Sequence, residues 1–321
     1  MNMWLKSCLV LILIAISFSC KRTLTAEEGE KHLRAFDNEI ISVVNHLKNN
    51  EAIAVAKKLF SISTLPIPFK YHHQPDTPFP FNELKGIYRY DSLQNRCIKM
   101  SISDSIIIQF PFKSEHDSIA LFIIADYSES LSIWGNMFPV KADIKLEIEG
   151  RNAITLKSEG IMKYQVPTQS RSIITIEDYS LILDIHSKLS KRKSRMFVDA
   201  ELTKSNKTLF SLLANTNVLY SDLNGNLFTN LNAQLSIFPI EADVHANFGA
   251  IRADSHQFVH DFNKHISIHV KDEKGRHIGN IVLRDKPYTN RINLAVEYED
   301  KTFTYLEDFL FIARELMNVK M

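Results

Sequence analysis

The sequence predicts an α+β protein built on a mostly antiparallel β-sheet, with a helical hairpin before the sheet and a helix after it. After Gly86, apolar and polar residues alternate with a period of two through segment after segment, whereas apolar residues of 26–47 recur at spacings of three and four. A content of 45% hydrophobic and 23% charged residues over 321 positions suits an ordinary globular core. A curved half-barrel is one form that such a sheet could take.

The first nineteen residues have the form of a secretory signal peptide. Lys6 precedes an apolar run that ends at Phe18, and this run is shorter than the ~20 residues that a membrane-spanning helix needs. The letters "ISFSC" then resemble a loose form of the bacterial lipoprotein pattern, in which the cysteine is acylated and becomes the mature N-terminus. We therefore expect Cys20 to carry lipid, with ordinary secretion and a retained signal anchor as alternatives.

Cysteine usage agrees with a lipid-anchored, exported chain. Cys8 leaves with the signal and Cys20 is acylated, so Cys97 stands alone and the mature chain holds no intramolecular disulfide. Lys21 and Arg22 follow without the acidic run that accompanies surface export in many Bacteroidota lipoproteins. The expected location is the cell envelope, anchored through the lipid at the periplasmic side of the outer membrane.

The helical hairpin breaks at Asn49 and Asn50, and a shorter helix follows through Leu59. A proline-rich connector comes next, because five prolines remove backbone donors and hold the chain extended. In the sheet region, alternation such as Ile144, Lys145, Leu146 and Glu147 predicts strands with one solvated face. The expected divisions are a signal peptide (1–19), the lipidated N-terminus and hairpin (20–62), the connector (63–85), an antiparallel β-rich body (86–208), and a second β-rich part with two helices (209–321).

Several short stretches resemble an uncharacterised family of Bacteroidota lipoproteins. They are the lipid cysteine, the early helical hairpin, "GIYRYD" followed by "IIIQFPF" and "IIADYS", a central proline-led strand, and "YEDKTFTYLEDFL" near the C-terminus. The resemblance implies no activity or catalytic residue. The run of long antiparallel strands with helices on one side is also similar to the half-barrel of periplasmic lipoprotein carriers and receptors, which implies a concave apolar face for acyl chains.

Composition and motifs argue against several classes of function. The formal charge of +1 supplies no field that would draw in nucleic acid, so we expect no nucleic-acid partner. The chain contains no G-x-G-x-x-G or G-x-x-x-x-G-K-[ST] string and no G-x-S-x-G elbow. We therefore expect no cofactor, and Cys97 fits a half-buried strand residue better than a nucleophile.

Histidines are the best candidates for chemistry. His256 and His260 are four residues apart on a helix expected over 254–265, so they share a face and could grip zinc if a third ligand arrived. The string is "HQFVH", which lacks the glutamate of the H-E-x-x-H metalloprotease motif. These two residues define the alternative hypothesis of a metal-dependent hydrolase.

A basic cluster, "KLSKRKSR", lies between two expected strands. As a hairpin tip it is most simply a solvated turn, but its cations could also dock on anionic headgroups near the membrane. The candidate headgroup-binding residues are Lys191, Arg192, Lys193 and Arg195.

The function that the sequence favours is non-catalytic. We expect a membrane-anchored lipoprotein that binds an apolar ligand or a protein partner on one face of the sheet. Ligand-facing residues would come from the apolar sides of strands at 105–125 and 173–186. A structural or assembly lipoprotein without a ligand cavity is a further alternative.

Overall fold

The computed structural model describes most of the chain after the expected signal. The described residues are 24–68, 77–113, 118–132, 135–190, 193–221, 225–251, 257–286 and 291–311. The expected signal peptide and Cys20 lie outside them.

One sheet of sixteen strands runs through the described residues. The strand order is β16-β15-β14-β13-β12-β11-β10-β9-β8-β7-β6-β5-β4-β3-β1-β2, so nearly every strand lies beside its neighbour in sequence. Neighbours are antiparallel except β1 and β3, which are parallel. The strands are β1 (Gly86–Asp91), β2 (Arg96–Ser101), β3 (Ile106–Pro111), β4 (Ile119–Leu131), β5 (Met137–Ile148), β6 (Arg151–Lys163), β7 (Val166–Ile176), β8 (Tyr179–Ser190), β9 (Lys193–Lys204), β10 (Lys207–Ser221), β11 (Gly225–Ile237), β12 (Ile240–Ala246), β13 (Ile266–Asp272), β14 (His277–Lys286), β15 (Arg291–Glu297) and β16 (Phe303–Tyr305).

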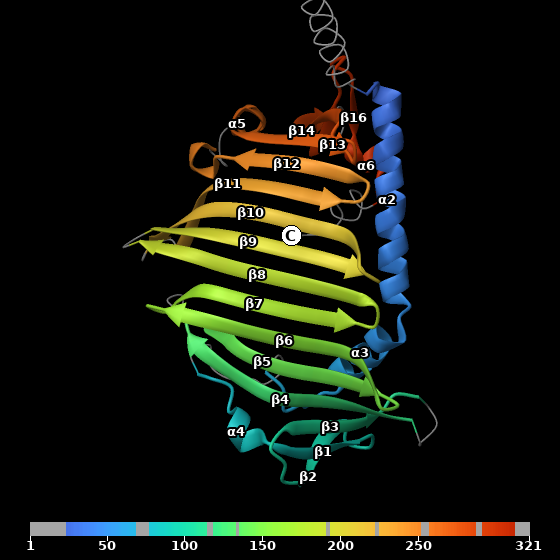
Figure 1. Cartoon of the computed structure of the whole chain (residues 1–321), viewed down its shortest axis with the longest axis vertical. Coiled ribbons are helices and arrows are strands. Elements are labelled where there is room, and N and C mark those ends of the chain that lie inside the picture. Colours follow the sequence, from blue (N-terminus) through green and yellow to red (C-terminus); the bar gives the residue numbers. More distant parts are fainter. Residues whose placement is uncertain are drawn as a thin grey trace, which may run out of the picture.

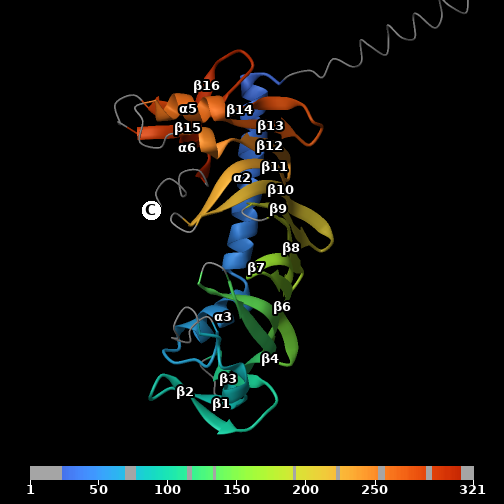
Figure 2. The same ribbon diagram turned by 90° about the vertical axis from the view of Figure 1, so that its left-hand side faces the viewer.

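The sheet is open and curved, which confirms the predicted fold class. Figure 1 shows the strands stacked from β2 at one end to β16 at the other. Figure 2 shows the sheet bowed, with α3, α5 and α6 on the inner side of the curve. Strand β10 spans 207–221, so the sheet continues across the division expected between 208 and 209.

The predicted N-terminal helix pair is present as α2 (Ala26–Lys48) and α3 (Glu51–Ser61). Thr25 and Glu28 form a capping box at the start of α2, with each side chain accepting the other residue's backbone N–H. Asn50 caps α3 by accepting the backbone N–H of Ile53. Both helices therefore begin where a side chain satisfies backbone donors that have no partner within the helix.

Short helices complete the fold. The predicted C-terminal helix is present as α6 (Leu306–Phe309), and the described part of the helix expected over 254–265 is α5 (Phe258–His265). The others are α4 (Phe81–Leu84) and the 3-10 turn η1 (Phe248–Ala250). Among the described residues, no helix is both long enough and apolar enough to cross a membrane.

Helix α2 runs across the strands along one side of the sheet (Figure 1). Near its start, Gly29 lies against Tyr298 and Ile278, and a Cβ on Gly29 would come within 3.0 Å and 3.1 Å of their side chains. Beyond its end, the Asn50 Nδ2 donates to the Glu177 carboxylate at 2.7 Å in the turn between β7 and β8. These contacts hold α2 to strands that are far apart in the sequence.

We expect Gly29→Leu to lower the free energy of unfolding by about 1–3 kcal/mol, because the added side chain overpacks the contact with Tyr298 and Ile278. Leucine is a better helix former than glycine, so any loss of stability reports the contact rather than helix propensity. The matched control is Ala35→Leu on the exposed face of α2. Thermal and urea unfolding followed by circular dichroism measure both variants, and equal stability of the two would contradict the close approach.

Buried apolar residues form two separate clusters at the two ends of the sheet. The first packs α3 against β3, β4 and β5, and it includes Leu59, Ile108 and Ile124. The second packs α2 and α6 against β12, β13 and β14, and it includes Leu33 and Val270. The connector contributes to the first cluster, because its Leu65, Ile67, Phe79 and Phe81 are all buried.

Candidate functional site

The two faces of the sheet differ in chemistry. Residues that are direct partners in adjacent strands project to the same face, so the register assigns side chains to a face across the whole sheet. Leu235 lines a hollow together with Leu33 and Phe36 of α2, which places its row on the side that carries this helix. We call this side the inner face; the row through Leu235 contains Ala142, Ser158, Ser172, Leu183, Ala200, Leu212, Leu235, Ala242 and Val270.

The opposite face, called the outer face, is polar over the same strands. Arg171 of β7 pairs with Asp184 of β8 at 3.3 Å, and Lys141 of β5 pairs with Asp126 of β4 at 2.7 Å. Thr155 and Thr175 bond to each other across β6 and β7 at 2.5 Å. The outer face is therefore suited to contact with solvent. The alternation of apolar and polar residues in the sequence places the two kinds of side chain on opposite faces.

Among the described residues, nothing buries the inner face fully between the two buried clusters. Over the middle strands its large apolar side chains are only half-buried, and they belong to neither cluster. They are Leu181, Leu183, Ile185, Met196, Val198, Leu202, Leu212 and Leu231. A contiguous apolar surface of this extent, bordered by polar groups, is typical of a binding site rather than of a solvated surface.

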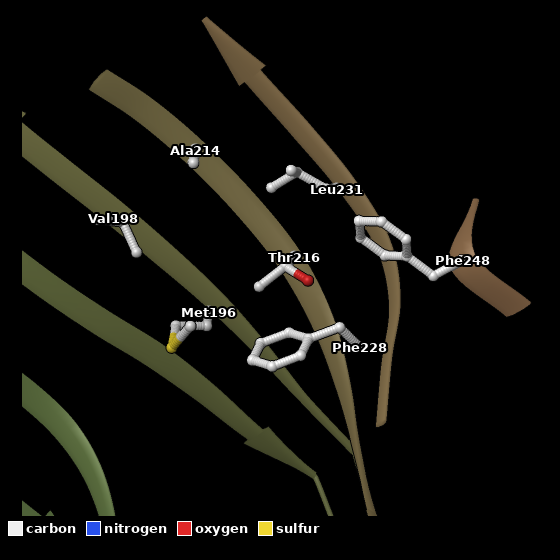
Figure 3. A pocket seen from close by; sticks show the side chains of 7 residues that line it. All are labelled: Met196, Val198, Ala214, Thr216, Phe228, Leu231 and Phe248. Carbon is white, nitrogen blue, oxygen red and sulfur yellow. The ribbon is translucent and has the colours of Figure 1, made fainter. Parts of the chain in front are cut away.

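A hollow of about 430 Å³ lies in this half-buried region, over β9, β10 and β11. Figure 3 shows side chains from the three strands projecting to one side, with the Phe248 ring of η1 beside them. Phe228 is 50% exposed and Phe248 is 38% exposed, so both rings stand partly open to solvent. The lining residues are Met196, Val198, Ala214, Thr216, Phe228, Leu231 and Phe248.

A second hollow of about 190 Å³ continues the inner face beneath α2 and α6. Its floor is formed by Leu235, Ile237 and Ile268, and its cover includes Leu33 and Leu310. Leu235 belongs to the same row as Leu212 and Ala200. The two hollows therefore lie on one apolar surface.

Several hydroxyl groups on the inner face are already satisfied within the sheet. The Thr216 Oγ1 donates to the Asn230 carbonyl at 2.5 Å, and the Ser187 Oγ donates to the Pro167 carbonyl at 2.8 Å. The Ser158 and Ser172 hydroxyls bond to each other at 2.8 Å. Since these groups have partners within the protein, the surface can cover hydrocarbon without leaving them unpaired.

The histidines of the hydrolase hypothesis are only partly placed. His260 is exposed on α5, and His256 lies outside the described residues. No group of three histidine, cysteine, aspartate or glutamate side chains in the described ranges is arranged to hold a metal ion. The zinc site at His256 and His260 stays a prediction from the sequence.

The basic cluster is placed at the tip of the β8–β9 hairpin. Lys193 and Arg195 are exposed on β9, whereas Lys191 and Arg192 lie outside the described residues. The Arg195 guanidinium lies 5.1 Å from the centre of the Phe197 ring, which fits a cation–π contact.

Of the two segments expected to face a ligand, one is buried in the first cluster and the other lies on the half-buried part of the inner face. Within 105–125, Ile106, Ile108 and Phe110 are fully buried in the first cluster. Within 173–186, Leu181 and Leu183 do lie on the inner face. β9, β10 and β11 were not expected to face a ligand. Their residues at every second position, such as Leu212, Ala214 and Thr216, nevertheless indicate a less polar side.

Cys97 lies half-buried in β2. Burial raises the pKa of its thiol to about 11. A thiol with this pKa holds little thiolate at neutral pH, which agrees with the structural role expected for it.

Comparisons with known proteins identify no family. No protein-family model matches the sequence, and no curated protein matches it either. Among solved structures, the chain is similar to a porin-like protein from Bacteroides vulgatus, with 9% identity over 68% of this chain and 90% of that chain. The TM-score of 0.19 is too low for this likeness to carry an argument.

Proposed function

We propose that this chain is a lipid-anchored envelope protein that binds the acyl chains of a lipid on the inner face of β8–β11. The single observation that carries the proposal is the apolar surface that the described residues leave half-buried between the two clusters. Each CH₂ group transferred from water onto such a surface contributes about 0.8 kcal/mol. Binding therefore needs contact area and no catalytic group.

The dimensions of the surface suit a long hydrocarbon. Four strands at a spacing of about 4.8 Å span roughly 14 Å from β8 to β11. One leaflet of a membrane's hydrocarbon core is about 15 Å thick, which is half of the full ~30 Å. A lipid chain lying across the strands would be covered along nearly all of its length, with room for its headgroup outside the apolar surface.

The chemistry of the surface favours hydrocarbon over a protein partner. Protein interfaces usually form about one hydrogen bond per 100–200 Å², whereas Thr216, Ser187 and the Ser158–Ser172 pair direct their hydroxyls to partners within the sheet. The strands of this region pair on both sides, so they present no free edge for an added strand. An acyl chain forms no hydrogen bonds, so it needs neither a donor on the surface nor a free strand edge.

The anchor and location belong to the same proposal. Acylation of Cys20, removal of residues 1–19, membership of a Bacteroidota lipoprotein family and a position at the periplasmic side of the outer membrane rest on the sequence patterns given above. A tethered protein with an acyl-binding face would hold lipid close to the membrane to which it is attached.

Native mass spectrometry of the soluble chain from Lys21 onward, purified without chelator or detergent, tests the function. We expect the native mass to exceed the denatured mass by that of a phospholipid-sized adduct. A bare chain that also fails to take up lipid from added vesicles would contradict acyl binding. Stoichiometric zinc that disappears in His260→Ala would instead favour the hydrolase.

A further inference from the structure

The strand ends farthest from α2 form a rim with its own chemistry. Helix α2 reaches the β7–β8 turn through the bond between Asn50 and Glu177. Strand β8 leads away from that turn for twelve residues, Tyr179–Ser190, which is roughly 40 Å at the usual rise. The β6–β7 and β8–β9 turns therefore lie together at the edge opposite α2, on the left of Figure 1. We call this edge the basic rim.

Cations without acidic partners gather on the basic rim. Four basic side chains here are exposed, and none forms an ion pair with another described residue. Arg195 and Lys188 both lie over the Phe197 ring, with the Lys188 Nζ at 5.8 Å from its centre, and the ring of His186 stacks on Phe197 at 4.8 Å. The four residues are Lys163, Lys188, Lys193 and Arg195.

The turns at the α2 end carry charges of both signs, since Lys204 and Lys207 flank the β9–β10 turn there. The β5–β6 and β7–β8 turns carry Glu149, Glu177 and Asp178, all exposed. Lys113, a cation beside the first of these turns, is paired with Glu149 at 3.2 Å. An anionic surface would therefore meet cations without acidic partners at the basic rim, and charges of mixed sign at the turns beside α2.

Apolar groups accompany the cations on the same rim. Tyr164 in the β6–β7 turn is 89% exposed, and Ile161 just before it is 52% exposed. Phe228 lies at the rim end of β11, opposite Val218, and lines the larger hollow of the inner face. Exposed tyrosine with lysine and arginine is the combination found at membrane–water interfaces. Lys188 and Arg195 project to the outer face of the same strand ends whose inner face carries Phe228.

We propose that the basic rim docks on an anionic lipid bilayer, and that acyl chains pass between the bilayer and the inner face beside Phe228. The second part rests on the function proposed above, whereas docking itself depends only on the rim. Charge draws the rim to the headgroups, Tyr164 and Ile161 enter the interface, and the open end of the apolar surface then lies against the membrane.

Co-sedimentation of the soluble chain with vesicles tests the docking. We expect binding to phosphatidylcholine vesicles that contain 30% phosphatidylglycerol, and little binding to phosphatidylcholine alone. Raising the salt should release the protein, because screening weakens contacts between exposed charges. Equal binding to the two kinds of vesicle, or no binding to either at low salt, would overturn the proposal.

Charge reversal assigns the binding to the rim. The double variant Lys188→Glu and Arg195→Glu should weaken binding to the anionic vesicles at least about thirtyfold, from the usual contribution of two basic residues beside such a surface. The control, Lys57→Glu with Lys58→Glu on the exposed side of α3, makes the same change in net charge and should reduce binding much less. Equal losses in the two double variants would assign the effect to net charge and refute the rim.

Two further measurements separate the steps. Tyr164→Ser should weaken vesicle binding by about fivefold at low and high salt alike, because it removes an interfacial ring and no charge. The rim variant should still show the lipid adduct in native mass spectrometry if the protein is loaded from detergent-solubilised lipid. Loss of docking with retained loading in the unaltered chain would refute the rim proposal alone. Loss of loading in the unaltered chain would refute acyl binding, and with it the passage of acyl chains beside Phe228, but not docking.

Discussion

Replacing Ala214 by glutamate is expected to abolish binding of acyl chains, with a loss in affinity of at least about a hundredfold. Ala214 lies on the inner face between Val198 and Ala233 and lines the larger hollow. A carboxylate there must either lose its hydration beneath the ligand or hold the ligand away from the sheet. Either effect makes the free energy of binding less favourable by several kcal/mol. Titration with a fluorescent fatty acid measures the affinity.

The neighbouring residue provides a matched control. Leu213 projects from the same strand to the outer face and is 52% exposed. Leu213→Glu changes the net charge by the same amount as Ala214→Glu. Because its side chain lies on the exposed outer face, this variant should keep both the fold and the affinity for acyl chains. If Leu213→Glu abolished binding and Ala214→Glu did not, the ligand would belong to the outer face, and the assignment of the site would be wrong.

Replacing Asp272 by alanine is expected to cost about 3–5 kcal/mol in free energy of unfolding, the usual cost of breaking a buried ion pair by removing one partner. Asp272 is fully buried in the β13–β14 turn. It accepts the backbone N–H groups of Lys274 and Arg276 at 3.0 Å and 2.8 Å, and the Arg276 Nε at 2.7 Å. Its removal would leave these donors without their acceptor.

This carboxylate also predicts how stability depends on pH. Burial alone would raise the pKa of Asp272, but the hydrogen bonds from Arg276 and Lys274 and the charge of Arg276 outweigh burial and lower it. Its contribution is therefore complete above the unfolded-state pKa of about 3.9 and is lost as the pH falls through the lower folded-state pKa. Urea unfolding at pH 7 and at several values below 4 should show the gap between wild type and Asp272→Ala closing as the pH falls.

Asp300 offers the comparison for this prediction. It occupies an equivalent place in the β15–β16 turn, where it accepts the backbone N–H of Thr302 at 3.0 Å, but it is exposed and has no arginine partner. Asp300→Ala should therefore cost much less than Asp272→Ala. Similar losses for the two variants would mean that the turn bond, and not the buried ion pair, stabilises this end of the sheet.

Much of the fold could be predicted because its causes are local. The capping box of Thr25 and Glu28 and the spacing of apolar residues locate α2, and the alternation around Ile144 and Leu146 identifies β5 with one buried side. Nearly all of the strands pair with their neighbours in sequence, so the antiparallel arrangement follows from successive turns. The packing of the connector could not be predicted in the same way. Its prolines indicate an extended path, but they do not indicate that Ile67 and Phe79 are buried.

For the candidate site, the sequence predicts the apolar character of the surface but not its location on the sheet. An apolar side of the strands was expected, yet the stretch at 105–125 is buried in the first cluster, and the larger hollow lies over β9, β10 and β11. Periodicity assigns the same alternation to a buried strand and to a half-buried one. The basic rim shows the same limit, since Lys188 and Arg195 are close in sequence whereas Tyr164 joins them only through the arrangement of the hairpins.

The sequence by itself therefore determined that this protein has a long antiparallel sheet with one apolar and one polar side, because strand alternation and helix capping depend on residues a few positions apart. Only the tertiary structure decided where the apolar side stays half-buried. That depends on where α2 lies, and α2 is held by contacts such as Gly29 with Tyr298 and Asn50 with Glu177. Such contacts join residues more than a hundred positions apart, and no local pattern in the sequence specifies them.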